Sequence, residues 1–259
     1  MDGLRRTAES VAVQTYADME WIVVDGGSTD GTREWLQKMK DESRGNDFRN
    51  FNSSNLRILS EPDKGVYDAQ NKGIRLAKGE FCFFLNAGDS FCRADVLERM
   101  MAMPLDADIV YGNEVVVDAE GKRVGYCKGV ENPGFVDLYN SCMKHQATFI
   151  RRALFEKYGN YDSTMRICAD FDWFFRVIGF HDEVRLCYRD VDVAWFENMG
   201  LSYHNPELCR RERQEILDRY MSKRLQQDYA VYGRYPRIAK MSFQRLPRLL
   251  IRIANGLLK

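Results

Sequence analysis

The chain has 259 residues, 45% of them hydrophobic and 12% aromatic, so it is long enough to bury one sizeable core. Its 38 basic and 38 acidic side chains cancel, which excludes a net field that would hold the molecule on nucleic acid. The seven cysteines form no CxxC pair, which argues against a disulfide framework and against a zinc site. Because the chain opens without an apolar signal core and has no apolar run of roughly 20 residues, we expect a cytoplasmic protein.

Strand and helix patterns alternate along the chain. EWIVVD predicts a strand over 20–25, and GGSTDGT leads into a helix over 33–42 that Ser28 or Thr29 can cap. A strand is expected at 56–60 and a helix at 66–79. The stretch 80–91 is predicted as a buried strand that runs into a loop with an acid. Further strands are predicted at 108–118, 145–150 and 186–196, and a further helix at 169–179. The alternation favours the α/β class, with a mixed, mainly parallel sheet flanked by helices.

Aspartates occur in loops that follow predicted strands. Asp25 ends the first strand, Asp63 lies in the turn EPDKG, and Asp89 follows the run EFCFFLN. Ligands of α/β sheets bind outside the carboxyl ends of the strands, so we expect the three acids to converge. Each one alone is more simply explained as a residue that caps or begins a turn. Their combination is therefore the informative feature.

Several separate motifs carry a family resemblance. They are VVDGGSTDGT, EPDKGVYDAQNKGI, KGEFCFFLNAGDSF, DIVYGN, and HQATFIRRALFEKYGNYD followed by ADFD. In order and spacing, from about Thr7 to about Ser202, they resemble the family 2 glycosyltransferases of the GT-A fold. The resemblance implies an inverting transfer of a sugar from a nucleotide-diphosphate donor, with the donor and a metal at the strand ends and a carboxylate base opposite.

The resemblance also implies roles for the donor side. Asp25 matches the acid that contacts the donor's base, and Asp63 and Lys64 are expected beside the nucleotide sugar. The family's metal motif corresponds to the stretch from Asn86 to Asp89, in which only Asp89 is acidic. One carboxylate suffices for Mg²⁺ or Mn²⁺ when water and substrate phosphates supply the other ligands. We therefore expect Asp89 to bind the metal and Asn86 to contact the donor.

A sugar or lipid hydroxyl needs a base in the transition state. Asp170 of ADFDW matches the second acid of the family's base motif, whereas Asp172 would point to a different face of a helix. The alternative is that both acids only stabilise the start of the helix through its dipole. Histidines can act as metal ligands or diphosphate donors, and His145 is the first candidate for donor contact, ahead of His204 and His181.

The sequence departs from the family pattern at the amino terminus. The helix that GLRRTAESVAVQTY resembles normally follows an apolar strand, so we expect the first strand of the domain to be missing. A non-catalytic or impaired relic of the GT-A fold is the alternative to an active enzyme, and a glycoside hydrolase ranks last. We expect a catalytic domain over residues 1–205 and a helical extension over 206–259.

The extension ends in a segment that is amphipathic at helical spacing. Apolar and basic side chains alternate between two faces over residues 243–259. Such a helix can lie on an anionic membrane surface, where a lipid-linked acceptor would be available, or pack on its own domain or on a homodimer partner. The acceptor is a saccharide or a lipid-linked molecule, and UDP-sugars and cell-surface polysaccharide assembly are expected by analogy.

Overall fold

The computed structural model describes residues 1–42, 55–102, 106–141, 143–197 and 200–232. Most of the predicted elements are present, and the helix predicted at 169–179 has these bounds in the structure. The elements in chain order are α1 (Asp2–Ala12), β1 (Trp21–Asp25), α2 (Thr32–Glu42), β2 (Leu56–Ser60), α3 (Val66–Leu76), β3 (Phe81–Cys82), β4 (Ser90–Phe91), α4 (Val96–Met100), β5 (Ile109–Val117), β6 (Arg123–Cys127), α5 (Phe135–Tyr139), η1 (His145–Ala147), β7 (Thr148–Arg151), α6 (Arg152–Tyr158), α7 (Ala169–Gly179), β8 (Leu186–Glu197), α8 (Leu201–His204), α9 (Pro206–Tyr220) and α10 (Lys223–Tyr232).

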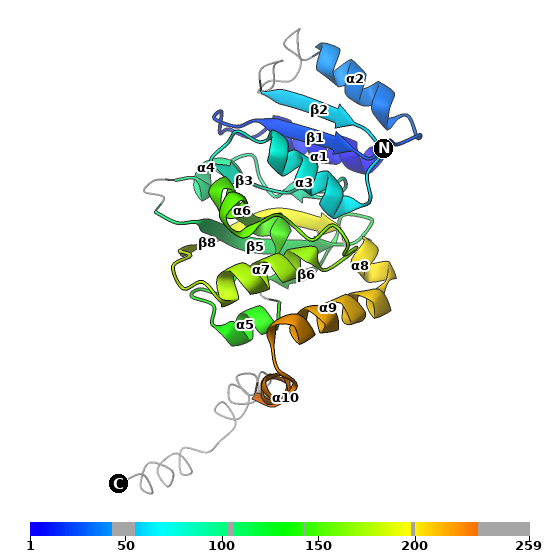
Figure 1. The fold of residues 1–259 in the computed structure, drawn as a ribbon. Coiled ribbons are helices and arrows are strands. Elements are labelled where there is room, and N and C mark those ends of the chain that lie inside the picture. The colour runs from blue at the N-terminus through cyan, green and yellow to red at the C-terminus, as the bar shows by residue number, and fades with distance from the viewer. Residues whose placement is uncertain (43–54, 103–105, 142, 198–199, 233–259) are drawn as a thin grey trace, which may run out of the picture.

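Two sheets form the centre of the molecule (Figure 1). β1 and β2 make a two-stranded parallel sheet, and the larger sheet has the order β3-β7-β5-β8-β4, with β6 paired to β5. The expected α/β class, with helices flanking a mixed sheet, is confirmed. Among the described strands, parallel pairing joins β1 with β2 and β5 with β8, and the other pairs are antiparallel, so the larger sheet is more antiparallel than expected. One reason is the tight turn over 118–122, which returns the chain directly from β5 into β6 as a hairpin.

The larger sheet separates two apolar cores. Alternate residues of a strand point to opposite faces, and β5 follows this rule: Ile109 and Tyr111 enter one core, and Val110 enters the other. The first core contains the apolar faces of α7 and α9, and the second contains those of α1, α2 and α4. Helices therefore cover both faces of the sheet.

Two local predictions differ from the structure at element ends. α2 begins at Thr32, and its first N–H group donates to the carboxylate of Asp30 at 3.2 Å, so neither Ser28 nor Thr29 caps this helix. The run HQATFI is a strand only from Thr148, because residues 145–147 form a single 3₁₀ turn. The second difference places His145 in a turn before the strand instead of in the strand itself.

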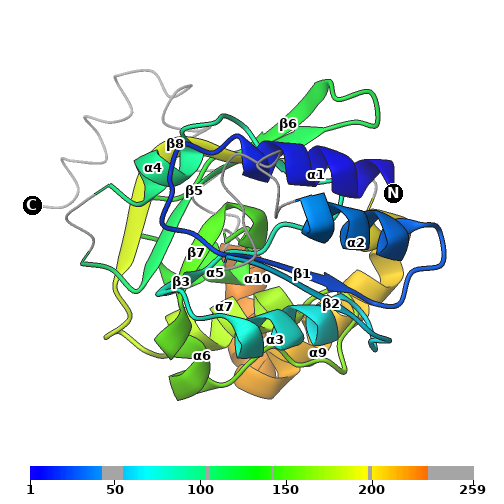
Figure 2. The ribbon, with the colours of Figure 1, turned by 90° about the horizontal axis from the view of Figure 1, so that it is seen from above.

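A large cavity lies between the two sheets, with a volume of about 1250 Å³. Consecutive residues of β1, Trp21 to Val24, border it, and so does the segment 81–87. Because successive side chains point to opposite faces, it is the edge of β1 that faces the cavity. Among the described residues no strand pairs with that edge. Seen from above, α1 and α2 lie on one side of β1 and β2, and α3 lies on the other (Figure 2).

Polar side chains of α1, and of Gln14 just beyond its end, contact the backbone of the segment 88–93. Thr7, Ser10 and Gln14 recur at helical spacing and each contacts a main-chain group of that segment. The Thr7 hydroxyl donates to the carbonyl oxygen of Asp89 at 2.7 Å. α1 therefore fixes the backbone of the loop that carries Asp89.

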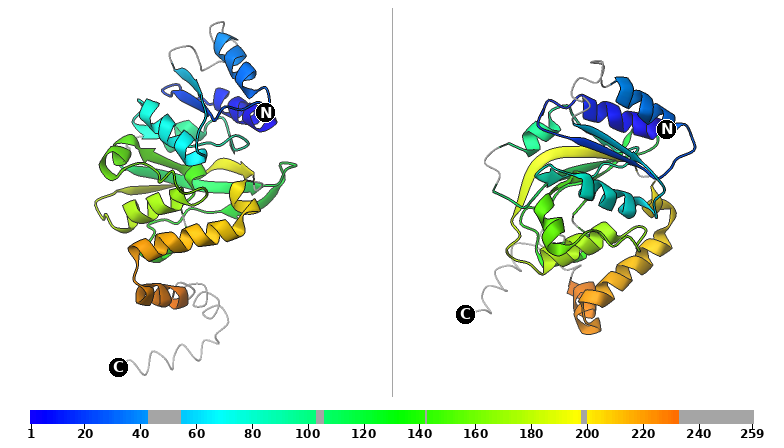
Figure 3. Two further views of the ribbon diagram at one scale, coloured as in Figure 1. Left: turned by 45° about the vertical axis from the view of Figure 1, so that its right-hand side comes forward. Right: turned by 45° about the horizontal axis from the view of Figure 1, so that its top comes forward.

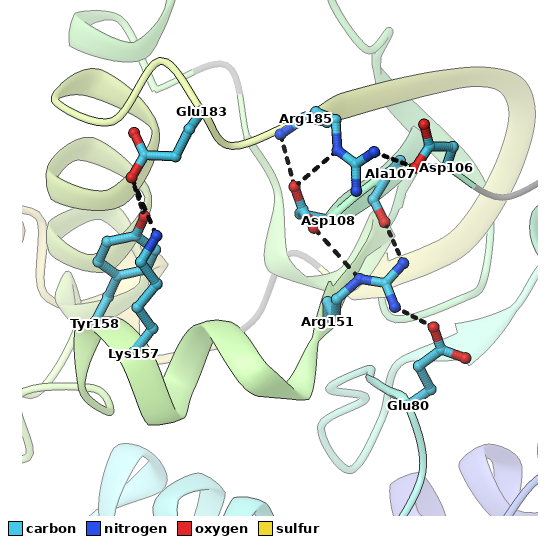
Figure 4. A network of polar contacts seen from close by, with 9 residues as sticks. All are labelled: Glu80, Asp106, Ala107, Asp108, Arg151, Lys157, Tyr158, Glu183 and Arg185. Carbon is cyan, nitrogen blue, oxygen red and sulfur yellow. Dashed lines mark hydrogen bonds and ion pairs between the residues drawn. The ribbon is translucent and has the colours of Figure 1, made fainter.

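Arginine ion pairs connect strands of the larger sheet at the amino end of β5 (Figure 4). Arg151, at the end of β7, pairs with Asp108 at 3.4 Å and with Glu80. Arg185, just before β8, also pairs with Asp108 and with Asp106. Asp108 thus connects β5, β7 and β8, three strands that are far apart in sequence.

The two C-terminal helices lie on the side of the molecule away from β1 and β2 (Figure 3). α9 buries Ile216 and Leu217 in the same core as α7, so this helix packs on the rest of the fold. The division of the chain at residue 205 stays a prediction, and residues 243–259 lie outside the described part. Within that part, none of the helices has the length and apolar character needed to cross a bilayer.

Candidate active site

Asp170 lies in the first turn of α7 and lines the cavity. Its Oδ2 atom is 2.9 Å from Nδ1 of His145, which belongs to the 3₁₀ turn before β7. Its Oδ1 atom accepts a hydrogen bond of 2.9 Å from the Tyr67 hydroxyl of α3. Three elements from different parts of the chain therefore position one carboxylate.

The pKa values of the two partners move in opposite directions. Burial would raise the pKa of Asp170, but the hydrogen bond and charge of His145, with the Tyr67 hydrogen bond, outweigh it and lower that pKa. Burial would lower the pKa of His145, but its hydrogen bond to Asp170 and the nearby carboxylates outweigh it and raise that pKa. Asp170 is consequently ionised at neutral pH and able to accept a proton.

His145 continues the polar contacts toward the loop that follows β3. Its Nε2 atom is 3.2 Å from Nδ2 of Asn86, and the Asn86 side-chain oxygen is 3.3 Å from Nε2 of Gln70 on α3. The Asn86 carbonyl accepts the backbone N–H of Asp89 at 3.0 Å. Asp170, His145, Asn86 and Asp89 are thus joined by successive contacts, as four of the predicted site residues.

Asp89 is almost completely buried, at 4% exposure. Its Oδ1 atom accepts the backbone N–H of Glu197 at 3.3 Å, whereas Oδ2 is buried without a hydrogen-bond partner among the described residues. Burial raises the pKa of Asp89 to about 7, although the charge of His145 acts in the opposite direction. Gly88, at φ +111°, gives the turn that presents this side chain.

The fit of a divalent cation rests on that carboxylate. An uncompensated buried Oδ2 atom is what a hard cation such as Mg²⁺ or Mn²⁺ would neutralise. No group of three or more metal-ligating side chains occurs within the described residues, so the described part of the protein offers fewer than three ligands there. Water and the phosphates of a substrate would have to complete the coordination.

The remaining donor-side candidates form a second group at the ends of β1 and β2. Asp25 is buried and accepts the Ser60 hydroxyl at 2.6 Å and the Ser28 N–H at 3.2 Å, which fixes the turn after β1. The Asp63 carboxylate lies against Gly26, where an added Cβ would come within 2.4 Å of its Oδ2 atom. Lys64 beside it is exposed. The structure does not join this group to Asp170 by hydrogen bonds.

Asp172 is directed away from Asp170, as the helical spacing predicts. It is buried and pairs with Arg219 at 3.3 Å and with Arg176 at 3.6 Å. These contacts give it a structural role. His204 is exposed on α8, and the ring of His181 packs against Tyr158, so neither joins the group around Asp170.

Three residues near the site were missed by the sequence reasoning. Tyr67 and Gln70 lie three residues apart on one face of α3, and their polar ends both reach the group around Asp170. Glu114 lines the cavity and is buried within the apolar strand β5, where burial raises its pKa. An acid inside the run IVYGNEVVV is a visible signal, because buried carboxylates are rare unless they are paired or functional.

Comparison with known proteins identifies the class. The model of glycosyl transferase family 2 matches residues 2–178, and the chain belongs to this family. The match includes β1, the Asp89 loop, His145 and Asp170, so the site described above lies in the family's domain.

Relatives with this domain occur in mycobacteria. The chain is 36% identical over 195 residues to the "PGL/p-HBAD biosynthesis glycosyltransferase" of Mycobacterium bovis and of Mycobacterium tuberculosis, an alignment that covers 74% of this chain and 70% of the relative. An uncharacterized glycosyltransferase of M. tuberculosis is 30% identical over 185 residues, with 68% and 64% covered.

Solved structures share the GT-A fold. Staphylococcus aureus TarS 1-349 in complex with UDP superimposes with a TM-score of 0.58 at 16% identity, over 87% of this chain and 65% of that one. The Pyrobaculum calidifontis mannosyltransferase PcManGT, in complex with GDP-Man and Mn²⁺, gives a TM-score of 0.53 at 18% identity, over 82% and 57%. The chain therefore spans less than two thirds of either solved chain.

Proposed function

We propose that this protein moves a sugar from a nucleoside diphosphate sugar to an acceptor hydroxyl with inversion at the anomeric carbon. The observation that carries the proposal is the ionised Asp170 in the cavity, joined through His145 and Asn86 to the Asp89 loop. A UDP-sugar is the proposed donor, which is supported by the likeness to TarS with bound UDP. Cell-surface polysaccharide assembly is the proposed setting, supported by the relatives named for PGL/p-HBAD biosynthesis.

The acceptor half of the reaction requires a base. The acceptor oxygen attacks the anomeric carbon from the side opposite the diphosphate, the carbon–diphosphate bond breaks, and the hydroxyl proton passes to Asp170. Tyr67 and His145 contact different oxygens of the Asp170 carboxylate, and a carboxylate has about four lone-pair sites, so a lone pair remains for that proton. Tyr67 and His145 fix the orientation of the carboxylate, which limits the motion that would misplace the base.

The donor half uses Asp89 and the residues beside it, together with the second group at the ends of β1 and β2. Asp89 binds the divalent ion, which when bound would offset negative charge on the departing diphosphate. Asn86 and His145 contact the donor beside it, while Asp25, Asp63 and Lys64 contact the nucleotide. The relic alternative is favoured by one observation: no described strand pairs with the edge of β1 that borders the cavity.

We propose that the reaction takes place in the cytoplasm and that its acceptor is a saccharide or a lipid-linked molecule. Residues 243–259 are the segment proposed to contact an anionic membrane surface, because their apolar and basic side chains separate at helical spacing. Flotation of the protein with anionic liposomes, with and without this segment, tests that contact, and equal flotation of both forms would remove it.

The two acids provide the test of function. Calorimetry with UDP and Mn²⁺ measures donor binding, and release of UDP from a UDP-sugar measures turnover. Asp89→Ala should lose Mn²⁺-dependent binding and turnover together. Asp170→Asn should bind UDP normally but turn over roughly 10²- to 10⁴-fold more slowly, since it removes only the general base.

Asp172→Asn is the matched control, two residues further along the same helix and paired with arginines. Its turnover should change little once correct folding is established by circular dichroism. A dead Asp172→Asn beside a mild Asp170→Asn would show that the base is misassigned. Absence of UDP binding in the wild-type protein would favour the relic.

A further inference from the structure

Two arginines, Arg166 and Arg213, line the same cavity as Asp170. Arg166 lies in the loop before α7, and Arg213 lies on α9. The Arg213 guanidinium carbon is 4.1 Å from the ring centroid of Phe171, the residue that follows Asp170. We call Arg166 and Arg213 the arginine pair.

The buried Glu212 carboxylate connects α9, which carries Arg213, to the loop that carries Arg166. The Glu212 carboxylate, next to Arg213, accepts the backbone N–H of Arg166 at 2.8 Å and the N–H groups of Ile167 and Cys168 at 2.9 Å each. Both oxygens of Glu212 are therefore engaged by main-chain donors. The carboxylate orients the loop but forms no ion pair with either guanidinium within the described part of the chain.

Neither arginine of the pair forms an ion pair with another described residue. Arg213 donates to the carbonyl oxygen of Tyr139 and stacks on Phe171. Burial lowers the pKa of Arg213, which reflects the cost of a desolvated cation. Lys144 also lines the cavity, but the nearby Glu114 carboxylate attracts it.

The position of the pair favours the acceptor over the donor. The contacts run from Asp89 through Asn86 and His145 to Asp170, and then from Phe171 to Arg213. Arg213 is thus next to the proposed base in this series, whereas Asp89, the proposed metal ligand, is at the other end. Planar guanidinium groups bind phosphate and carboxylate through paired hydrogen bonds.

On these grounds we propose that the arginine pair binds an oxyanion of the acceptor, a phosphate or a carboxylate near the hydroxyl that receives the sugar. The acceptor of this enzyme is therefore an anionic molecule rather than a neutral sugar. This assignment of the acceptor class rests on the proposed function, whereas the anion site itself can be measured without turnover.

Titration with small anions tests the proposal. Glycerol 3-phosphate and glycerate are the probes and glycerol is the neutral control, each added to the protein saturated with UDP and Mn²⁺ and followed by NMR. At least one anion should bind and glycerol should not. Arg166→Gln and Arg213→Gln should each weaken that binding roughly 10- to 100-fold, the loss expected for one charge-assisted hydrogen bond.

Arg210→Gln is the control on the same helix, because Arg210 is exposed and pairs only loosely with Glu207 at 3.9 Å. It should bind the anion as the wild-type protein does. Arg166 is exposed, so Arg166→Gln keeps the test valid even if Arg213→Gln fails to fold. Equal anion binding by Arg166→Gln and wild type, or no binding by wild type, would overturn the proposal.

Two further outcomes separate this proposal from the proposed function. Anion binding that disappears when UDP is added would assign the pair to the donor and overturn the acceptor site. If UDP does not bind at all, the proposed function fails, while the same titration without UDP still decides whether the arginine pair holds an anion.

Discussion

The two sheets of this molecule differ in how fully their strands are paired. In the larger sheet β5 pairs with β7 and β6 on one side and β8 on the other, and arginines secure its amino end. In the smaller sheet β1 pairs with β2 alone among the described strands, and its second edge borders the cavity. Asp170 and His145 belong to elements packed on the larger sheet, whereas Asp25 ends β1. The proposed chemistry is thus held by the better-packed region, and nucleotide contact is assigned to the other.

Hydrogen exchange should show the largest difference between the two sheets. Amides of β5 lie between paired neighbours and should exchange only through global unfolding, while those of β1 and β2 should exchange through local opening. We expect protection factors in β1 at least about 100-fold below those in β5. Mass spectrometry of peptides covering 19–26 and 108–117 measures this, and equal protection would show that the smaller sheet is no less stable.

Valine truncation compares the packing of the two sheets. Val110 of β5 and Val23 of β1 are both buried in the same core, but Val23 also borders the cavity. Val110→Ala should cost about 1.6 kcal/mol of unfolding free energy for two lost carbons, plus a cavity contribution. Val23→Ala should cost less, because part of the space beside it is already empty. Urea unfolding of both variants decides, and equal costs would contradict the comparison.

The smallest expected effect is the pH dependence of the contact between Asp170 and His145. The pKa of His145 is raised in the folded protein, so protonated His145 stabilises the fold. This stabilisation is complete below pH 6.5, the ordinary pKa of histidine, and is lost as pH rises through the folded pKa. The pKa of Asp170 is lowered in the folded protein, so ionised Asp170 also stabilises the fold. This stabilisation is complete above pH 3.8, the ordinary pKa of aspartate, and is lost only as pH falls through the folded pKa. Both contributions are present between these limits.

His145→Gln should therefore be destabilised most between pH 4 and 6.5, by an amount that shrinks at higher pH. Urea unfolding at a series of pH values measures the difference from wild type. His204→Gln, which removes an exposed histidine from α8, is the control and should follow the wild-type curve. A His145→Gln difference that is constant from pH 5 to 9 would exclude the ion pair.

Local periodicity predicted the elements better than their pairing. The alternation of strands and helices gave the α/β class, and helical spacing separated Asp170 from Asp172 correctly. The share of parallel strand pairs was overestimated, because hairpin turns such as 118–122 reverse the chain without a crossover helix. The two-residue strands β3 and β4 also show how a long apolar run can lie mostly outside a ladder.

The contacts within the site could be predicted only in part. Asp89, Asn86, His145 and Asp170 were singled out from motifs, and the structure joins them through successive contacts. The partner atoms were not predictable, since His145 and Asp170 are 25 residues apart and meet only through tertiary packing. Their roles as base, metal ligand and donor contacts stay predictions.

The Glu212 carboxylate has a consequence for how this enzyme can be recombined with its relatives. The family match ends at residue 178, yet the loop that leads into Asp170 is held by an acid 34 positions beyond that boundary, at residue 212. A chimera joined at the boundary would inherit the motifs and lose the carboxylate that orients them. Grafts between relatives should therefore carry α9 together with the domain, or keep an acid at the position of Glu212.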